Sequence, residues 1–531
     1  MATITSSGDP ELGADRSGSL APDAGRVPLP RQILVVGAVG GLLLGIGAFR
    51  LGVTPTPDPF VDLPGLHWLS TSPSGAFAAM GLIVTGMALL VGAWLAIGRV
   101  FWQGRRLSPG SLRRAFWAWS APLLLAPPLL SRDAYSYAAQ AHLAHIGLNP
   151  YLYGPGILPG SVYTPSVDPI WMYSPAPYGP LVLWLSGHVV GLVPNVSPGW
   201  RVYLAVLGVR LIAVAGVVML LYAVPRLART LGWDPGLALW LGVLNPLVLG
   251  HFVSGAHNDA LMLGLLMIGL ALVAERRLLT ATVAITLAVA IKVPAIVGLG
   301  FVAMAWAGTL TGPWRRVRAF TAVGVVSAAL FTAVTTFTGL GWGWISALGT
   351  PGMVRTLLST TTTTGTVLGW LAGLVGLQDV TNPAISVLRL LGTAAGVVVV
   401  AWLVLRRRQV DVARGTGLAL LAIVALSPAV QPWYVLWAVV PLAASRLSTR
   451  EVTVLTWSTV ALTFYSLVNG STMIAGVSQV GTVAVFAAAC AVVVIDHRRA
   501  LRGSRWPSFG ARPPTRRDPA TVQAPVVTSR R

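Results

Sequence analysis

The stretch "WAWSAPLLLAPPLL" (117–130) leads directly into "SRDAYSYAAQAHLAHIGLNPYLYGP" (131–155). The first part is almost entirely apolar, whereas the second holds an acid, several tyrosines, two histidines and an Asn-Pro-Tyr. Such an apolar run indicates a helix in hydrocarbon, and the abrupt change at Ser131 indicates the point where the chain reaches the water interface. The contrast raises the question of why polar and aromatic side chains gather where the chain leaves the membrane.

The composition of the whole chain supports a membrane location. Of its 531 residues, 55% are hydrophobic and 10% are charged, whereas an ordinary soluble domain carries roughly 25% charged residues. Several windows hold about 20 apolar residues, enough to cross a hydrocarbon core of about 30 Å. Polar and apolar residues do not alternate as they would in the strands of a membrane barrel. We therefore predict an all-α polytopic membrane protein.

The net charge of +21 does not indicate a nucleic-acid partner. The arginines do not form one basic domain with interleaved aromatic residues; they lie in the gaps between apolar segments. The gap 99–114 is strongly basic and 52–75 has no Lys or Arg, so the positive-inside rule places the first in the cytoplasm and the second outside. Extended along the chain, the rule predicts a multi-pass plasma-membrane protein with both termini in the cytoplasm.

The apolar segments predict about 14 transmembrane helices, several of them broken or short. We expect disordered cytoplasmic tails at 1–31 and 498–531, the second of them basic, around a polytopic domain at 32–497. Two further apolar pieces, 178–193 and 366–377, would be interfacial or re-entrant. The expected crossings are 33–51, 76–98, 112–130, 200–224, 236–253, 259–274, 278–291, 293–309, 319–340, 385–405, 415–430, 433–444, 452–469 and 478–495.

This topology places the long loop 131–199 outside, with Asp133 within a few residues of a helix end. A carboxylate at the junction of membrane and water could take a proton from an attacking hydroxyl group as a general base. The alternative is structural, because "SRD" could cap a helix that ends at Gly147. Position alone does not decide between these interpretations.

Other outward-facing turns carry further candidate residues. In "SGAHNDALM", His257 and Asn258 suggest polar ligand binding, whereas Asp259 could cap the next helix, and the nearby ligands are too few to predict a metal site. Lys292 lies at a helix break in "AIKVPAI", where it could meet a phosphate or extend to the interface. A second break, "SPAVQPWYVLW", and the loop 341–365 complete the set with Gln431, Trp433, Tyr434 and Arg355.

The motifs "RDAYSYAAQAHLAHIGLNPY", "SPAPYGPL", "GAHNDALMLGLL", "AIKVPA" and "SPAVQPWYVLW" occur in this order between Leu112 and Ile495. Together they resemble the actinobacterial polyprenol-phosphomannose-dependent α-1,6-mannosyltransferases, which are GT-C membrane glycosyltransferases. The resemblance implies a GT-C fold and an inverting transfer of mannose from polyprenyl-phosphate mannose to a lipid-anchored mannan of lipomannan type. It implies that Asp133 is the catalytic base and that the active site faces outside.

We expect a set of substrate-binding residues and no metal or cofactor, because Lys or Arg can neutralise a phosphate leaving group. This set consists of Arg132, Tyr135, Tyr137, Asn149, Tyr151, Tyr178, His257, Asn258, Asp259, Lys292, Arg355, Gln431, Trp433 and Tyr434. In GT-C enzymes the acid often follows the first helix, whereas three predicted helices precede Asp133 here. Two alternatives stay open: a GT-C transferase for another lipid-linked sugar such as arabinose, or a transporter that flips a lipid-linked sugar.

Overall fold

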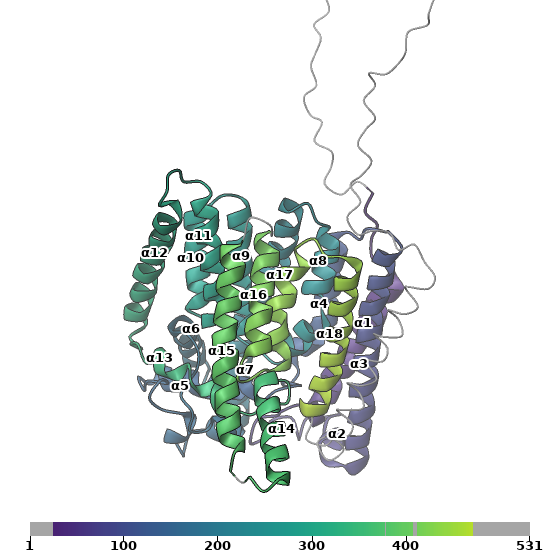
Figure 1. The fold of residues 1–531 in the computed structure, drawn as a ribbon. Helices are drawn as coiled ribbons and strands as arrows, with labels where there is room; N and C mark the ends of the chain where they lie inside the picture. Colours follow the sequence, from purple (N-terminus) through teal and green to yellow (C-terminus); the bar gives the residue numbers. More distant parts are fainter. Residues whose placement is uncertain (1–24, 378, 407–410, 471–531) are drawn as a thin grey trace, which may run out of the picture.

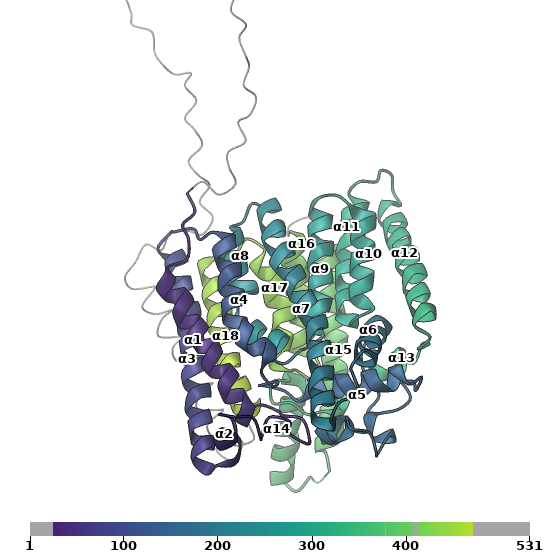
Figure 2. The ribbon, with the colours of Figure 1, turned by 180° about the vertical axis from the view of Figure 1, so that it is seen from behind.

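A computed structural model describes residues 25–377, 379–406 and 411–470. Within these ranges the chain is helical and has no strand, apart from one isolated bridge between Val27 and Leu107. The helices stand side by side in one bundle, with α1 and α3 along one edge and α12 along the opposite edge (Figures 1 and 2). The all-α prediction is therefore confirmed.

The first part of the bundle runs to residue 254. Its helices are α1 (Arg31–Leu51), α2 (His67–Thr71), α3 (Pro73–Trp102), α4 (Pro109–Leu125), α5 (Asp133–His145), η1 (Pro155–Ile157), η2 (Thr164–Ser166), η3 (Pro169–Trp171), α6 (Pro180–Gly191), α7 (Pro198–Thr230), α8 (Pro235–Gly242) and the π-helix η4 (Val248–Ser254).

The second part contains more short helices and more breaks. Its helices are α9 (Asp259–Ala274), α10 (Leu278–Val289), η5 (Val293–Ile296), α11 (Val297–Ala307), α12 (Arg315–Thr338), α13 (Trp344–Ala347), η6 (Thr350–Met353), α14 (Thr360–Leu374), α15 (Thr381–Leu405), α16 (Val412–Leu426), η8 (Pro432–Val435), α17 (Leu436–Ala443) and α18 (Thr449–Gly470).

Several of these helices are long and apolar enough to cross a bilayer. They are α1, α3, α7, α12 and α15, and a sixth span results if η4 and α9, which meet at 111°, count as one. The protein is thus a multi-pass membrane protein. The described part of the chain supports five or six spans by length and composition, so the expected 14 are not established. The last expected crossing, 478–495, and most of both expected tails lie outside the described residues.

The two helices before α4 that carry the additional N-terminal crossings pack closely together. α1 lies against α3 and α4, and glycines allow the close approach. A Cβ added at Gly40 would lie 2.8 Å from the backbone of Gly86 and of Leu90, and one added at Gly86 would lie 2.8 Å from the carbonyl oxygen of Gly40. Backbones this close leave no room for a side chain, so the glycines fix this helix pair at the edge of the bundle.

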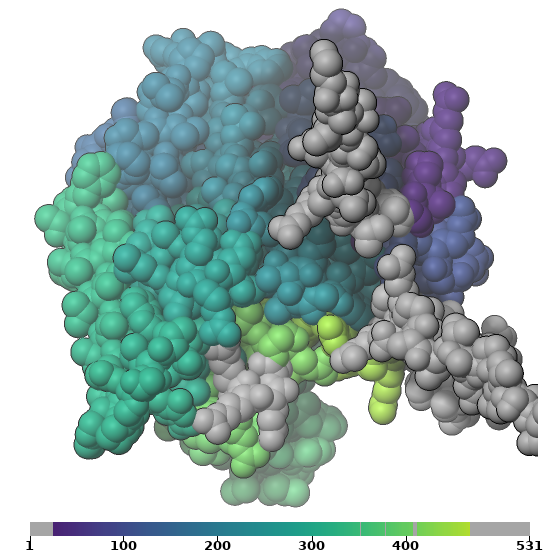
Figure 3. Space-filling view, turned by 90° about the horizontal axis from the view of Figure 1, so that it is seen from above, coloured from purple at the N-terminus to yellow at the C-terminus, as the bar shows by residue number. Residues whose placement is uncertain are grey.

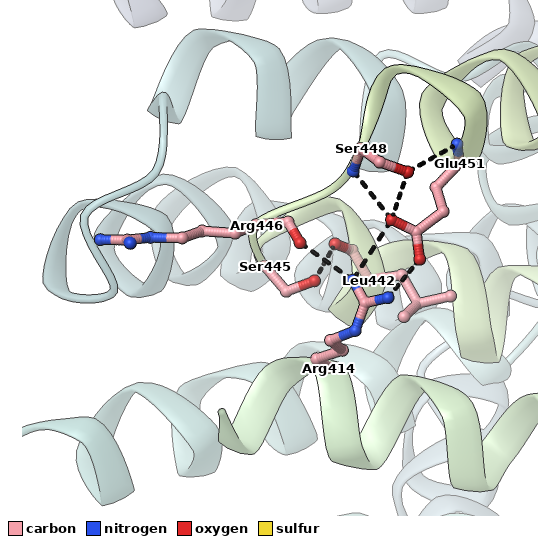
Figure 4. A network of polar contacts seen from close by, with 6 residues as sticks. All are labelled: Arg414, Leu442, Ser445, Arg446, Ser448 and Glu451. Atoms are coloured by element: carbon pink, nitrogen blue, oxygen red, sulfur yellow. Dashed lines mark hydrogen bonds and ion pairs between the residues drawn. The ribbon is translucent and has the colours of Figure 1, made fainter. Parts of the chain in front are cut away.

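One end of the bundle collects the basic gaps of the sequence, and we call it the arginine-rich end (top of Figure 1). Here Arg226 donates to both carboxylate oxygens of Glu275, and Arg26 pairs with Asp234 at the start of α8. Figure 4 shows a second network, in which Arg414 of α16 binds Glu451 of α18 and donates to the carbonyl oxygen of Arg446. Viewed onto this end, segments from purple to yellow lie side by side, so all parts of the described chain contribute to one bundle (Figure 3).

The helices break near the opposite end. The backbone of Lys292 is extended between α10 and η5, and the chain between α16 and η8 is not helical. Both predicted breaks are therefore confirmed. The apolar segment 366–377 lies mainly in α14, whose first turn binds the end of α16: Thr360 donates to the carbonyl oxygen of Ala425 and Thr362 to that of Pro428. These side chains satisfy carbonyl groups that the broken helix leaves free.

Candidate active site

A polar cavity of about 730 Å³ lies at the end of the bundle opposite the arginine-rich end. Most of its wall comes from five segments that are distant in the sequence, namely 51–56, 130–133, 168–171, 354–357 and 430–433, and His251, Tyr465 and Ser466 complete it. Its charged lining residues are Arg132, Asp133, Asp168 and Arg355. Of the expected site residues, the cavity wall brings together Arg132, Asp133, Arg355, Gln431 and Trp433.

Asp133 occupies the first position of α5 and points into this cavity. Its backbone N–H donates to Ser131 Oγ, while its carboxylate makes no capping bond to the helix. Instead, Oδ1 accepts a hydrogen bond of 3.1 Å from Trp171 Nε1. The capping interpretation therefore does not describe this side chain, although α5 ends near Gly147 as predicted.

The electrostatic setting of Asp133 favours proton transfer near neutral pH. Its side chain is only 17% exposed, and burial raises the pKa of the Asp133 carboxyl group to about 6. The hydrogen bond from Trp171 and the charge of Lys292 oppose this shift, because both stabilise the carboxylate. A carboxylate with such a pKa is ionised at pH 7 and still accepts a proton readily.

His257 lies beside Asp133 and is held from two sides. Its Nδ1 is 3.8 Å from Asp133 Oδ2 and 2.9 Å from the hydroxyl oxygen of Tyr137. Its ring stacks on Trp433, with centroids 3.8 Å apart. The ring of His251 lies 4.9 Å from that of Trp433 and 5.6 Å from that of His257, and His251 Nε2 is 2.9 Å from Ser466 Oγ. Of these three rings, Trp433 and His251 line the cavity, whereas His257 is fully buried and lies outside its wall.

Backbone irregularity brings His257 to this position. The π-helix η4 ends at Ser254, and Ala256 adopts a φ of 55°, which is unusual for a residue with a side chain. The chain then turns by 111° into α9. π-Helices and strained residues are common at functional sites. Here they aim His257 at Asp133.

Lys292 and Asp259 form a separate buried cluster beside the cavity. Lys292 Nζ is 2.8 Å from Asp259 Oδ1, which also accepts from Trp437 Nε1 at 2.7 Å. The ammonium group lies over the rings of Tyr434 and Trp437, 4.8 and 5.2 Å from their centroids. Lys292 therefore does not extend to the interface, and Asp259 does not cap α9. Neither residue is part of the cavity wall.

Other expected site residues fasten the loop that follows Asp133. The hydroxyl group of Tyr135 donates to the carbonyl oxygen of Val53, and that of Tyr151 donates to the carbonyl oxygen of Tyr178. Asn149 donates to the carbonyl oxygen of Leu340. Tyr178 packs edge-on against Tyr137, and Asn258 is buried at the start of α9. These bonds hold the loop, and their polar atoms do not line the cavity.

Sequence reasoning missed Trp171, Asp168, His251 and Ser466, all of which line the cavity. Trp171 stands in "DPIWMYSP", where no spacing or charge pattern marks it as a partner of Asp133, 38 residues earlier. His251 had a usable signal, because it is a histidine near the end of an apolar segment, six residues before His257. Among the described residues, no three His, Cys, Asp or Glu side chains form a set able to hold a metal ion.

A polar cavity whose wall carries the partly buried carboxylate of Asp133, at one end of an apolar helix bundle, is an arrangement typical of a membrane-embedded enzyme. Comparison with sequence families identifies the enzyme class. Residues 34–308 match the family described as alpha-(1->6)-mannopyranosyltransferase, N-terminal domain, and residues 361–496 match the MptB C-terminal domain. The chain therefore belongs to the alpha-(1->6)-mannopyranosyltransferase family, and it is a glycosyltransferase.

Curated relatives agree with this assignment over most of their length. A probable alpha-(1->6)-mannopyranosyltransferase of Mycolicibacterium smegmatis is 35% identical, over 92% of each chain. An alpha-(1->6)-mannopyranosyltransferase of Mycobacterium tuberculosis is 34% identical over 77% of each chain. Alpha-(1->6)-mannopyranosyltransferase B of Corynebacterium glutamicum is 34% identical, over 82% of this chain and 76% of its own. No solved structure matches the chain.

Proposed function

We propose that this protein transfers mannose from polyprenyl-phosphate mannose to a hydroxyl group of a growing, lipid-anchored α-1,6-mannan. One observation carries the proposal: Asp133, with a pKa raised by burial to about 6, lies on the wall of the 730 Å³ cavity. Mannosyltransfer is the activity of the family. The lipid-linked donor agrees with a site that opens among apolar helices, and the α-1,6 linkage agrees with the names of the relatives.

The proposed reaction is a single displacement. The acceptor oxygen attacks the anomeric carbon of mannose, and its proton passes to Asp133. The bond between that carbon and the donor's phosphate oxygen breaks, and its electron pair leaves with the polyprenyl phosphate. Attack opposite to the leaving group inverts the anomeric centre, so a β-linked donor gives an α-linked product. Asp133 then releases its proton to water.

Two cations lie where they can receive the leaving phosphate. Arg132 is adjacent to Asp133, and Arg355 stands on the segment 354–357 of the same cavity. Negative charge grows on the phosphate oxygens as the bond breaks, and guanidinium groups stabilise such charge through paired hydrogen bonds. We do not assign Lys292 to the leaving phosphate, because Asp259 already binds its ammonium group. Instead, Lys292 holds together the buried cluster in which Tyr434 and Trp437 pack.

The experiment that tests the proposal is transfer of radiolabelled mannose in proteoliposomes containing only this protein, polyprenyl-phosphate mannose and an α-1,6-mannan acceptor. A base must be ionised to accept a proton, and the pKa of Asp133 is about 6. The rate should therefore be constant above about pH 7 and fall about tenfold for each pH unit well below 6. Absence of transfer, or movement of the donor across the bilayer without transfer, would refute the proposal.

We also propose that the cavity faces the outside and that both termini face the cytoplasm, because the arginine-rich end is at the opposite side of the bundle. In a background with Cys490 replaced by Ala, a cysteine at Tyr173, which is 81% exposed near the cavity, should react with an impermeant thiol reagent in intact cells. A cysteine at Gln103, exposed at the arginine-rich end, should react only after the membrane is opened. The reverse labelling pattern would reverse the orientation.

A further inference from the structure

A second cavity, of about 620 Å³, is a groove between α11, α12, α15 and α16. Its wall is almost entirely apolar, and it includes Ile296, Phe320, Val400 and Leu426. The helices α12 and α15 that border it are the least buried of the long apolar helices, with 17% of their most apolar windows covered by protein. The groove therefore belongs to the side of the bundle that faces lipid.

Glycines form part of the wall of this groove. Gly392 and Gly396 lie one turn apart on α15, and Gly300 of α11 packs against Val404. A Cβ added at Gly396 would meet only Leu426, at 3.8 Å, so the space beyond it is open. From Gly392 to Leu405 the lining follows α15 for about 20 Å along its axis. These dimensions fit a single extended hydrocarbon chain.

The groove ends next to the polar cavity. Ser427 and Pro428 line the end of the groove, and the same segment continues through Val430 and Gln431 into the wall of the polar cavity. Side chains at the start of α14 hold this segment, because Ser359 donates to the carbonyl oxygen of Ser427 and Thr362 to that of Pro428. One fixed strip of backbone thus separates the two compartments.

Two arginines stand at this junction. Arg389 lies one turn before Gly392 and donates to Thr362 Oγ1 and to the carbonyl oxygens of Gly352 and Val354. Arg355, which follows Val354 in the chain, lines the polar cavity. A chain lying in the groove would therefore reach cationic groups where it enters the polar cavity. An apolar chain with an anionic head has this distribution of properties.

We propose that the groove holds the isoprenoid chain of the lipid-linked donor. The phosphate of the donor would lie where the groove ends, beside Arg355 in the polar cavity. This inference rests on the proposed function and adds the location of the donor's tail. It explains why the groove is open to lipid along its length while the polar groups are gathered at one end. A donor carried in the bilayer can then enter sideways, without leaving the hydrocarbon.

Gly396→Leu tests this inference, because its Cβ fits and the rest of its side chain fills the groove. Gly92→Leu is the matched control, since Gly92 is exposed on α3, at the edge of the bundle opposite α12, with no atom within 4 Å of an added Cβ. Each variant is assayed with long-chain polyprenyl-phosphate mannose and with a two-isoprene analogue too short to fill the groove. We expect Gly396→Leu to raise KM for the long donor about tenfold or more, since chain atoms lose buried contacts. KM for the short donor should change less than about twofold.

The two donors separate the possible failures. If turnover with the short donor is retained, an equal rise in KM for both donors, or none for either, would show that the groove does not hold the donor chain, for example because it holds an ordinary lipid. Retained use of the short donor proves that the variant is folded; if it is lost, Ala401→Leu, deeper in the groove, replaces it. No transfer by the wild-type protein from either donor would refute the proposed function itself.

Discussion

Replacing Asp133 by Asn is expected to lower the rate of mannosyl transfer by at least about 100-fold, the loss typical for a general base. Asparagine keeps the size of the side chain and an oxygen that can accept the hydrogen bond from Trp171. It cannot take the proton of the acceptor hydroxyl group. The rate constant at saturating donor and acceptor is the measurement that checks this.

The variant should also remain folded. Burial raises the pKa of Asp133 from 3.8 to about 6, so its ionised form is less favourable in the folded protein than in the unfolded chain. The stability contributed by the protonated form is complete below pH 3.8 and is lost as the pH rises through 6, which amounts to about 3 kcal/mol at pH 7. Removing the charge should therefore not destabilise the protein.

Asp168→Asn provides the matched control. Asp168 also lines the cavity, but its carboxylate accepts a hydrogen bond from the backbone N–H of Ile170. Asparagine can make the same bond, so the rate should change by only a few-fold. A variant Asp133→Asn that turns over at a nearly normal rate, or an Asp168→Asn variant that is equally inactive, would remove Asp133 from its proposed role.

Replacing Lys292 by Ala is expected to destabilise the protein by about 3–5 kcal/mol, the usual cost of breaking a buried ion pair. The change leaves the carboxylate of Asp259 buried, with Trp437 Nε1 as its remaining hydrogen-bond donor. It also removes the cation from beneath the rings of Tyr434 and Trp437. Thermal unfolding in a fixed detergent, followed by tryptophan fluorescence, measures the loss.

The double variant Lys292→Met, Asp259→Asn should recover most of this stability. It leaves no unpaired charge, and the asparagine oxygen can still accept from Trp437 Nε1. If the single and double variants are equally unstable, the ion pair is not what holds this cluster. If the double variant is stable but its KM for the donor rises sharply, Lys292 contacts the donor phosphate after all.

The sequence predicted the parts of the site that depend on local pattern. The sequence marks Asp133 as a candidate because this acid follows directly after an apolar run. It predicts the helix breaks at Lys292 and Pro428 because proline and polar residues interrupt apolar segments there. Partners distant in the chain could not be found in this way. Trp171 and Asp133 are 38 residues apart, and Lys292 and Asp259 are 33 apart. No periodicity connects such residues; the fold alone brings them together.

The number of crossings could not be determined from the sequence for a related reason. An apolar segment has the same composition whether its helix crosses a bilayer or ends halfway. α16 ends after 15 residues, and the threonines of α14 complete its last carbonyl groups. The partner that ends α16 lies about 65 residues earlier in the chain. Sequence composition therefore located the helices and could not determine which of them span the membrane.

Arg210 has a consequence for how the protein responds to the bilayer around it. Its guanidinium group donates to the carbonyl oxygens of Leu124 and Ala126 at the end of α4, and to that of Ser254 at the end of η4. Asp133 follows the end of α4 and His257 follows the end of η4. The side chain of Arg210 therefore ties together the two segments that lead to Asp133 and His257.

Bilayers differ in thickness, and long helices tilt in response. We therefore expect the exposed helices α12 and α15 to tilt, and the segments that Arg210 ties together to keep their relative positions. The helices at the lipid-facing side would then adjust to the bilayer, while the segments around the polar cavity would keep their geometry. Its proton-transfer geometry should stay constant in membranes whose lipid composition changes with growth conditions.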